Sequence, residues 1–275
     1  MSNRLDARQG IKYQSFKVAS NSDLELAMGN VTGHTSVNKH GRAPLGVQQL
    51  TTDIWDRADA VPTQRIWDAP TEARVHTIVS SLAGDDGDPV GVGARTIRVY
   101  GLKDWDTAET SEVLTMNGTT GVVMADAYVI IHRMEVLTKG ATSTNVGTII
   151  ATAATDTSIT AAILPGVGRT QMAIFGFPST QTFYMTNYYA SLRVSGGAAS
   201  SVDVSLDFNP EPNVELTNFR TVHTRGVIRD GESAFENEFH PSRKFVGPGI
   251  IKINCLGSVD DLDVSAGFDG VLVDN

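Results

Sequence analysis

The strongest constraint on the fold is the alternation of apolar and polar residues in short runs separated by turn-forming residues. Residues 73–80 are Ala-Arg-Val-His-Thr-Ile-Val-Ser, and residues 202–208 are Val-Asp-Val-Ser-Leu-Asp-Phe. A period of two places one set of side chains on a buried face and the other in water, which is typical of a strand in an antiparallel sheet. No segment combines helical periodicity with capping residues, so we expect an all-β protein.

The expected strands fall into two series. About six strands lie between residues 73 and 163, separated by Gly, Thr, Ser and Asn and by the tight-turn pair Asn117-Gly118. The second series follows Pro165-Gly-Val-Gly168, with runs at 171–175, 183–194, 202–208, 219–227, 235–239, 250–255 and 264–273. This spacing predicts two antiparallel β-sandwich domains of jelly-roll or immunoglobulin-like type, at residues 61–165 and 166–275. A single intertwined sandwich is the alternative.

Residues 1–60 differ from the rest because Asn, Gly, Ser, His and Lys are mixed there without a sustained period. We predict an extended N-terminal arm over residues 1–60, ordered only where it lies on a neighbouring subunit. The echo Ile54-Trp55-Asp56 and Ile66-Trp67-Asp68 follows. We interpret its two tryptophans as a buried clip that fastens the arm to the first domain.

Charge and cysteine content limit the partners. The net charge is -9, from 22 basic and 31 acidic residues, and an acidic chain repels phosphate backbones, so we expect no nucleic-acid partner. The single cysteine, Cys255, cannot form an internal disulfide or a cysteine-based metal site, and its apolar neighbours indicate a small buried residue. No apolar run is long enough for a membrane span or resembles a signal peptide, so we expect no membrane partner.

No arrangement of residues points to an enzyme. The six histidines are scattered, and His-Glu-x-x-His, Gly-x-Ser-x-Gly and phosphate-loop motifs are absent from the sequence. We therefore predict no catalytic residue, no cofactor and no metal site. The acidic loops Asp85-Asp86-Gly87-Asp88 and Asp260-Asp261-Leu262-Asp263 leave Ca²⁺ binding open, although neither has EF-hand spacing and solvated turns are the simpler interpretation.

The aromatic residues offer the one candidate interaction surface. It consists of Trp55, Trp67, Trp105, Tyr184 and Tyr188, and strand alternation places Tyr184 and Tyr188 on one face. Core packing is the simpler interpretation. A carbohydrate- or receptor-binding module is the alternative, and it requires these rings to be exposed.

Several runs resemble a module of virion structural proteins of marine tailed bacteriophages. They are Gly93-Ala-Arg-Thr-Ile-Arg-Val-Tyr-Gly-Leu102, Glu112-Val-Leu-Thr-Met-Asn-Gly-Thr-Thr120, Arg133-Met-Glu-Val-Leu137, Asn145-Val-Gly-Thr-Ile149 and Asp263-Val-Ser-Ala-Gly-Phe-Asp-Gly-Val-Leu-Val-Asp-Asn275. The similarity covers about residues 65–275. The sequence departs from the pattern of the family at Pro178-Ser-Thr-Gln181. It implies a β-sandwich virion protein with no catalytic residues to carry over.

We therefore expect a non-enzymatic virion protein that is assembled in the host cytoplasm. The first hypothesis is a capsid decoration or minor head protein that forms a homo-oligomer, as a trimer, and binds the major capsid protein. A tail, adaptor or baseplate component is the alternative, and a carbohydrate- or receptor-binding module is the second alternative.

Overall fold

The computed structural model describes residues 24–56, 64–142, 144–193, 200–228 and 233–275. Apart from one helical turn at 24–27, its regular structure is β, and all strand pairs are antiparallel, which confirms the predicted fold class. The strands are β1 (His34–Val47), β2 (Thr52–Asp53), β3 (Arg74–Ser80), β4 (Ala94–Leu102), β5 (Thr110–Thr115), β6 (Val122–Tyr128), β7 (Ile130–Lys139), β8 (Ile149–Ala153), β9 (Ile159–Ile163), β10 (Ile174–Phe177), β11 (Gln181–Arg193), β12 (Ser201–Asn209), β13 (Arg220–Ile228), β14 (Ala234–Val246), β15 (Gly249–Gly257) and β16 (Leu262–Asp274).

Eight of these strands form a jelly roll. One sheet has the order β1-β16-β11-β14, and the other has the order β10-β15-β12-β13, with β2 pairing to β15. Along the chain, β1 and β10–β16 alternate between the two sheets except for the neighbours β12 and β13. Two antiparallel four-stranded sheets connected in this way are the jelly-roll topology.

Six phenylalanines hold the two sheets of the jelly roll together. Their ring centroids lie 4.9–6.4 Å apart, in stacked, tilted and edge-on pairs. They are Phe175, Phe177, Phe183, Phe208, Phe245 and Phe268. Since they come from β10, β12, β11, β14 and β16, this core links both sheets and stabilises the sandwich through burial and aromatic contacts.

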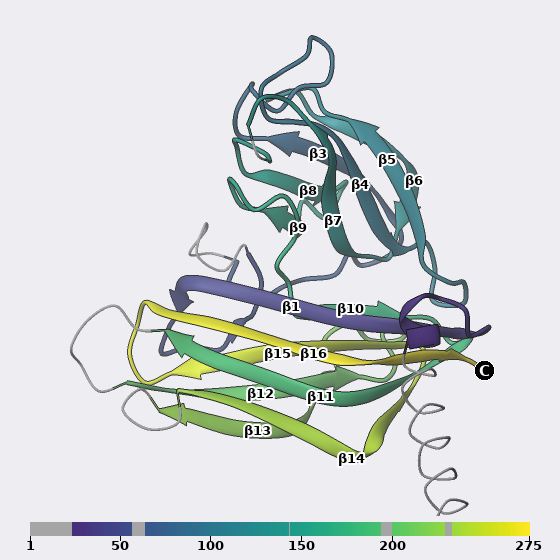
Figure 1. Cartoon of the computed structure of the whole chain (residues 1–275), viewed down its shortest axis with the longest axis vertical. Coiled ribbons are helices and arrows are strands. Elements are labelled where there is room, and N and C mark those ends of the chain that lie inside the picture. Colours follow the sequence, from purple (N-terminus) through teal and green to yellow (C-terminus); the bar gives the residue numbers. More distant parts are fainter. Residues whose placement is uncertain (1–23, 57–63, 143, 194–199, 229–232) are drawn as a thin grey trace, which may run out of the picture.

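The strands β3–β9 follow β2 and precede β10, so they are inserted between the first and second strands of the jelly roll. They form the sheets β6-β3-β8-β9 and β5-β4-β7. Figure 1 shows them as a second body standing above the edge formed by β1 and β10. At the junction, Ser179 N donates a hydrogen bond of 2.7 Å to Trp105 O. Trp67 joins both parts: its indole Nε1 donates to Thr160 O (2.8 Å) and its amide to Asp53 (2.8 Å).

The predicted arm needs correction. Residues 34–47 and 52–53 belong to the sheets of this chain, because β1 pairs with β16 over almost its full length and β2 pairs with β15. The sequence of β1 is polar because it is an edge strand with many exposed side chains, so alternation did not identify it. Residues 1–23 and 57–60 of the predicted arm lie outside the described residues. The predicted division between residues 165 and 166 stays a prediction.

Candidate functional site

The predicted aromatic surface is not exposed. Trp55, Trp67, Trp105 and Tyr188 are buried, and Tyr184 is partly buried. The two tyrosines lie on opposite faces of β11, because a β-bulge between Met185 and Asn187 adds one residue and reverses the alternation. Tyr188 therefore packs inward, and its hydroxyl bonds to the ring of a histidine on β13. Trp55, Trp67, Trp105 and Tyr188 are thus part of the core.

The acidic loops serve as internal acceptors. The carboxylate of Asp85 is buried and accepts hydrogen bonds from one hydroxyl and three backbone amides. Asp260 accepts from Gln49 N (3.0 Å), and Asp263 pairs with Arg42 (2.7 Å). Within the described ranges, no group of three or more His, Cys, Asp or Glu side chains is arranged to hold a metal ion.

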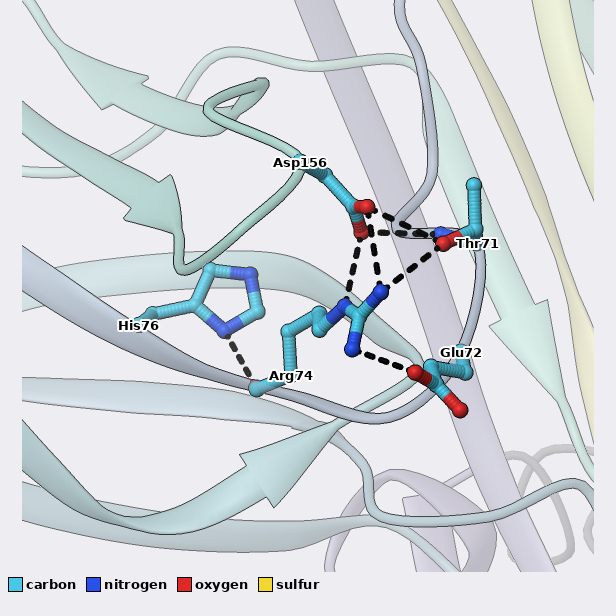
Figure 2. Close-up of polar contacts among 5 residues, drawn as sticks. All are labelled: Thr71, Glu72, Arg74, His76 and Asp156. Atoms are coloured by element: carbon cyan, nitrogen blue, oxygen red, sulfur yellow. Dashed lines mark hydrogen bonds and ion pairs between the residues drawn. The ribbon is translucent and has the colours of Figure 1, made fainter.

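A second polar cluster lies at the start of β3 (Figure 2). The Arg74 guanidinium donates to both oxygens of Asp156 (3.1 and 3.3 Å) and pairs with Glu72. The amide and hydroxyl of Thr71 also donate to Asp156 (3.1 and 3.0 Å). These contacts fasten the segment before β3 to the turn between β8 and β9.

The buried His76, next to this cluster, should make the stability of the folded protein sensitive to acid. Burial lowers the pKa of His76 from 6.5 to about 4, partly opposed by the hydrogen bond from Nδ1 to Arg74 O (2.9 Å). The folded state therefore binds fewer protons than the unfolded state between these values, and stability falls as pH drops below 6.5. Between pH 7 and pH 5 we expect a loss of about 2 kcal/mol from this residue.

The measurement is urea denaturation at both pH values. His76→Asn retains an N–H donor for the Arg74 carbonyl but cannot titrate, so its loss between pH 7 and pH 5 should be smaller by that amount. His34→Asn, at an exposed histidine, is the control and should behave as the unmodified chain. An unchanged pH dependence in His76→Asn contradicts the assignment.

A further candidate site is a cavity of about 480 Å³ at the junction between the jelly roll and the inserted strands. It is lined by residues of β1, β4, β7, β10, β11 and β16 and by residues of the segments before β5 and β10. One part of the wall is apolar and includes the buried Leu102, Phe175 and Leu272. The rest is polar and charged. A cavity of this size with an apolar wall and a few convergent polar groups is typical of a small-molecule site.

Lys39 is the central charged group of this cavity. It lies on β1, is 9% exposed, and donates from Nζ to the carbonyl of His132 at 2.5 Å. Burial lowers the pKa of Lys39 from 10.5 to about 7, a shift that the charge of Glu109 partly opposes and that of Arg133 reinforces. No carboxylate of the described chain lies within ion-pair distance of its ammonium. Buried charges are normally paired, so this ammonium lacks a usual partner.

The polar part of the cavity wall contains Glu109 and His132, which are hydrogen-bonded to each other. His132 Nε2 donates to Glu109 Oε2 at 2.5 Å, and Glu109 Oε1 accepts from Arg133 at 3.4 Å. Burial lowers the pKa of His132 despite the hydrogen bond to Glu109. Burial would raise the pKa of Glu109, but the hydrogen bond from His132 and the neighbouring positive charges hold it below its usual value. At neutral pH, Glu109 is thus ionised and His132 is neutral.

This charge state leaves one buried atom of His132 unsatisfied. A neutral ring that donates from Nε2 has an acceptor at Nδ1, and the described residues provide no hydrogen-bond partner for that atom. The side chain of His132 is also held by the ring of Phe175, at a centroid distance of 4.9 Å. Lys39 thus has spare donors at the cavity, and His132, which also lines it, has a buried acceptor without a partner among the described residues.

The sequence did not indicate this site. Lys39 falls in the segment predicted as an arm, and His132 is one of the six histidines that are scattered along the sequence. Lys39, Glu109 and His132 have no motif spacing. They meet only because β1 lies beside β7 and β10 after the chain has inserted seven strands between β2 and β10.

Comparisons with known proteins give no family for the chain. No protein-family model matches the sequence, and no curated protein does. Two solved structures, of infectious bursal disease virus strains Gx and Gt, align over 88% of this chain and over 71% and 73% of theirs. Their identities are 12% and 9%, and both TM-scores are 0.21. Likeness at this level carries no argument about fold or role. No helix in the described part of the chain has the length and apolarity needed to span a bilayer.

Proposed function

We propose that the protein is a structural component of a virus particle that acts by binding its neighbours. The observation that carries the proposal is the jelly-roll topology of β1 and β10–β16 with seven further strands inserted after β2. Jelly rolls form viral capsid, lectin and cupin domains. This assignment rests on analogy at the level of the fold, because one fold hosts several functions. The carbohydrate-binding alternative is weakened because the candidate stacking rings are mostly buried.

Edge strand β14 is the surface that we assign to assembly. Nine of its thirteen residues are exposed, whereas one of the thirteen residues of β16 is exposed. Glu236, Glu238 and Lys244 along β14, together with Pro241, oppose indiscriminate pairing of this edge with other strands. A specific neighbour that matches these side chains can still bind there. This surface is compatible with the capsid decoration role, in which a homotrimer binds the major capsid protein.

The resemblance to virion proteins of marine tailed bacteriophages supports the same proposal and makes it more specific. We propose a capsid decoration or minor head protein, without catalytic activity, that is assembled in the host cytoplasm. A tail, adaptor or baseplate position is the alternative. Both roles use the same binding chemistry, and they differ in where the chain lies in the particle.

The test is a cryo-EM map of intact particles from the source, with this chain fitted into the density. Density at three-fold or vertex positions of the shell supports the decoration role, and density only below the portal supports the tail role. Particles that lack the chain contradict the proposal as a whole.

Reconstitution tests the role of β14. Val246→Asp, at an exposed residue of β14, should reduce attachment of the purified chain to depleted particles at least tenfold. Val123→Asp, at a similarly exposed valine of β6, is the matched control and should leave attachment unchanged. Equal attachment of both variants contradicts the assignment of β14.

A further inference from the structure

We propose that the junction cavity binds a small organic anion, whose carboxylate pairs with Lys39 and whose apolar body packs on Phe175, Leu102 and Leu272. This inference concerns a ligand site and is independent of the role of the chain in a particle. Its basis is the combination of a cavity of about 480 Å³, a buried ammonium without an ion-pair partner among the described residues, and an apolar wall in one place.

The first step of the argument is the ammonium. Lys39 uses one N–H on the carbonyl of His132, and the described chain offers no carboxylate within ion-pair distance of Nζ. A buried ammonium is retained at a cost in stability unless an anion completes its surroundings. The cavity lies directly against this residue, so a ligand carboxylate can occupy the missing position.

The second step is the charge around the cavity. Arg133 and Arg169 also line it, and Arg169 is exposed and forms no ion pair or hydrogen bond from its side chain with the described residues. Glu109, the nearest acid to Lys39, is already engaged by His132 and Arg133. The chain as a whole is acidic, yet this cavity has three basic side chains against Glu109 and Glu135. Electrostatics therefore favour an anion here.

The third step is the apolar wall and the unsatisfied imidazole. Leu102, Phe175 and Leu272 line the cavity and are 1%, 6% and 7% exposed, so the apolar part of the wall consists of buried side chains. An inorganic anion would leave this surface unused, whereas a carboxylate on an aromatic or aliphatic body would cover it. His132 also lines the cavity, and its buried Nδ1 lacks a hydrogen-bond partner among the described residues. The cavity volume matches ligands of this class.

The test is calorimetric titration of the full chain with benzoate at pH 6, where benzoate is ionised and Lys39 is mostly protonated. We expect binding of benzoate and no binding of benzamide, the neutral analogue of similar shape. Inorganic phosphate is the probe for an anion site without an apolar part. Binding of phosphate but not benzoate, equal binding of benzamide, or no binding of benzoate overturns the proposal.

Variants locate the site. Lys39→Met keeps the length of the side chain and removes the charge, and should weaken benzoate binding at least tenfold. This variant should fold, because an apolar group of similar volume replaces an unpaired buried charge. Arg169→Gln, at an exposed residue, should weaken binding about threefold at low salt. Lys244→Met, at an exposed lysine of β14, is the control and should bind as the unmodified chain. Unchanged affinity in Lys39→Met overturns the proposal.

The pH dependence gives an independent readout. Affinity should fall as pH rises from 6 to 9, because Lys39 loses its proton in this range while benzoate keeps its charge. Any benzoate that still binds to Lys39→Met should do so with an affinity that does not fall between pH 6 and pH 9. The charged and titratable groups that line the cavity with Lys39 are Glu109, Glu135, His132, Arg133, Arg169 and His40. An affinity that is constant from pH 6 to pH 9 contradicts a role for the Lys39 ammonium.

Discussion

Replacing Asp85 by alanine is expected to lower the free energy of unfolding by about 4 kcal/mol, measured by urea denaturation. The carboxylate is fully buried and accepts from Ser80 Oγ (2.6 Å), Ala94 N (2.7 Å), Val146 N (2.8 Å) and Gly147 N (2.8 Å). The variant leaves all four donors without their acceptor in a place that water does not reach. Removing a buried acceptor costs more free energy than the hydrogen bonds contribute to stability in the first place. The reason is that each donor left without a partner is still kept away from water.

Two further variants separate this explanation from a general effect of acidic loop residues. Asp85→Asn retains an acceptor for some of the donors, so we expect an intermediate loss. Asp88→Asn, at an exposed residue of the same loop, should change the free energy of unfolding by about 0.5 kcal/mol or less. Equal losses at positions 85 and 88 would show that Asp85 is not an internal acceptor of this kind.

Replacing Lys252 by methionine is expected to cost about 3 kcal/mol. Lys252 Nζ lies 2.8 Å from Asp53 Oδ2, with the two side chains 8% and 0% exposed. Burial raises the pKa of Asp53, an effect that Lys252 and the amide of Trp67 partly oppose. Removal of the lysine leaves a buried carboxylate without its counter-charge. The pair also connects β2 to β15, so the segment that leads to the inserted strands should loosen.

A double-mutant cycle tests this explanation. Asp53→Asn combined with Lys252→Met removes both charges and retains an acceptor for Trp67 N, so it should be more stable than Lys252→Met alone. Lys103→Met is the control, because its partner Asp126 is half exposed and a pair of this kind contributes little. If the double variant is no more stable than Lys252→Met, the cost does not come from the unpaired carboxylate.

The sequence predicted the fold class and most of the strands because both depend on local patterns. Alternation located β3 and β12 to within a residue, since one face of each strand is buried and the other is wet. It did not find β6, and it ended the run at 235–239 where β14 continues through Pro241 to Val246. Edge strands tolerate proline and polar residues because one side of their backbone faces solvent, so their sequences carry a weaker signal.

The tertiary structure alone decided how the strands are partnered and which residues meet at the candidate site. The polar segment His34–Val47 becomes a strand because β16 offers it a complementary edge more than 200 residues later in the chain. The bulge in β11 turns Tyr184 and Tyr188 to opposite faces, and no local pattern specifies the extra residue. Lys39, Glu109 and His132 meet because seven inserted strands fold back onto the β1 edge of the jelly roll. Local alternation records which side of a strand is buried, but it contains no information on the partner, because pairing depends on backbone hydrogen bonds that every sequence can form.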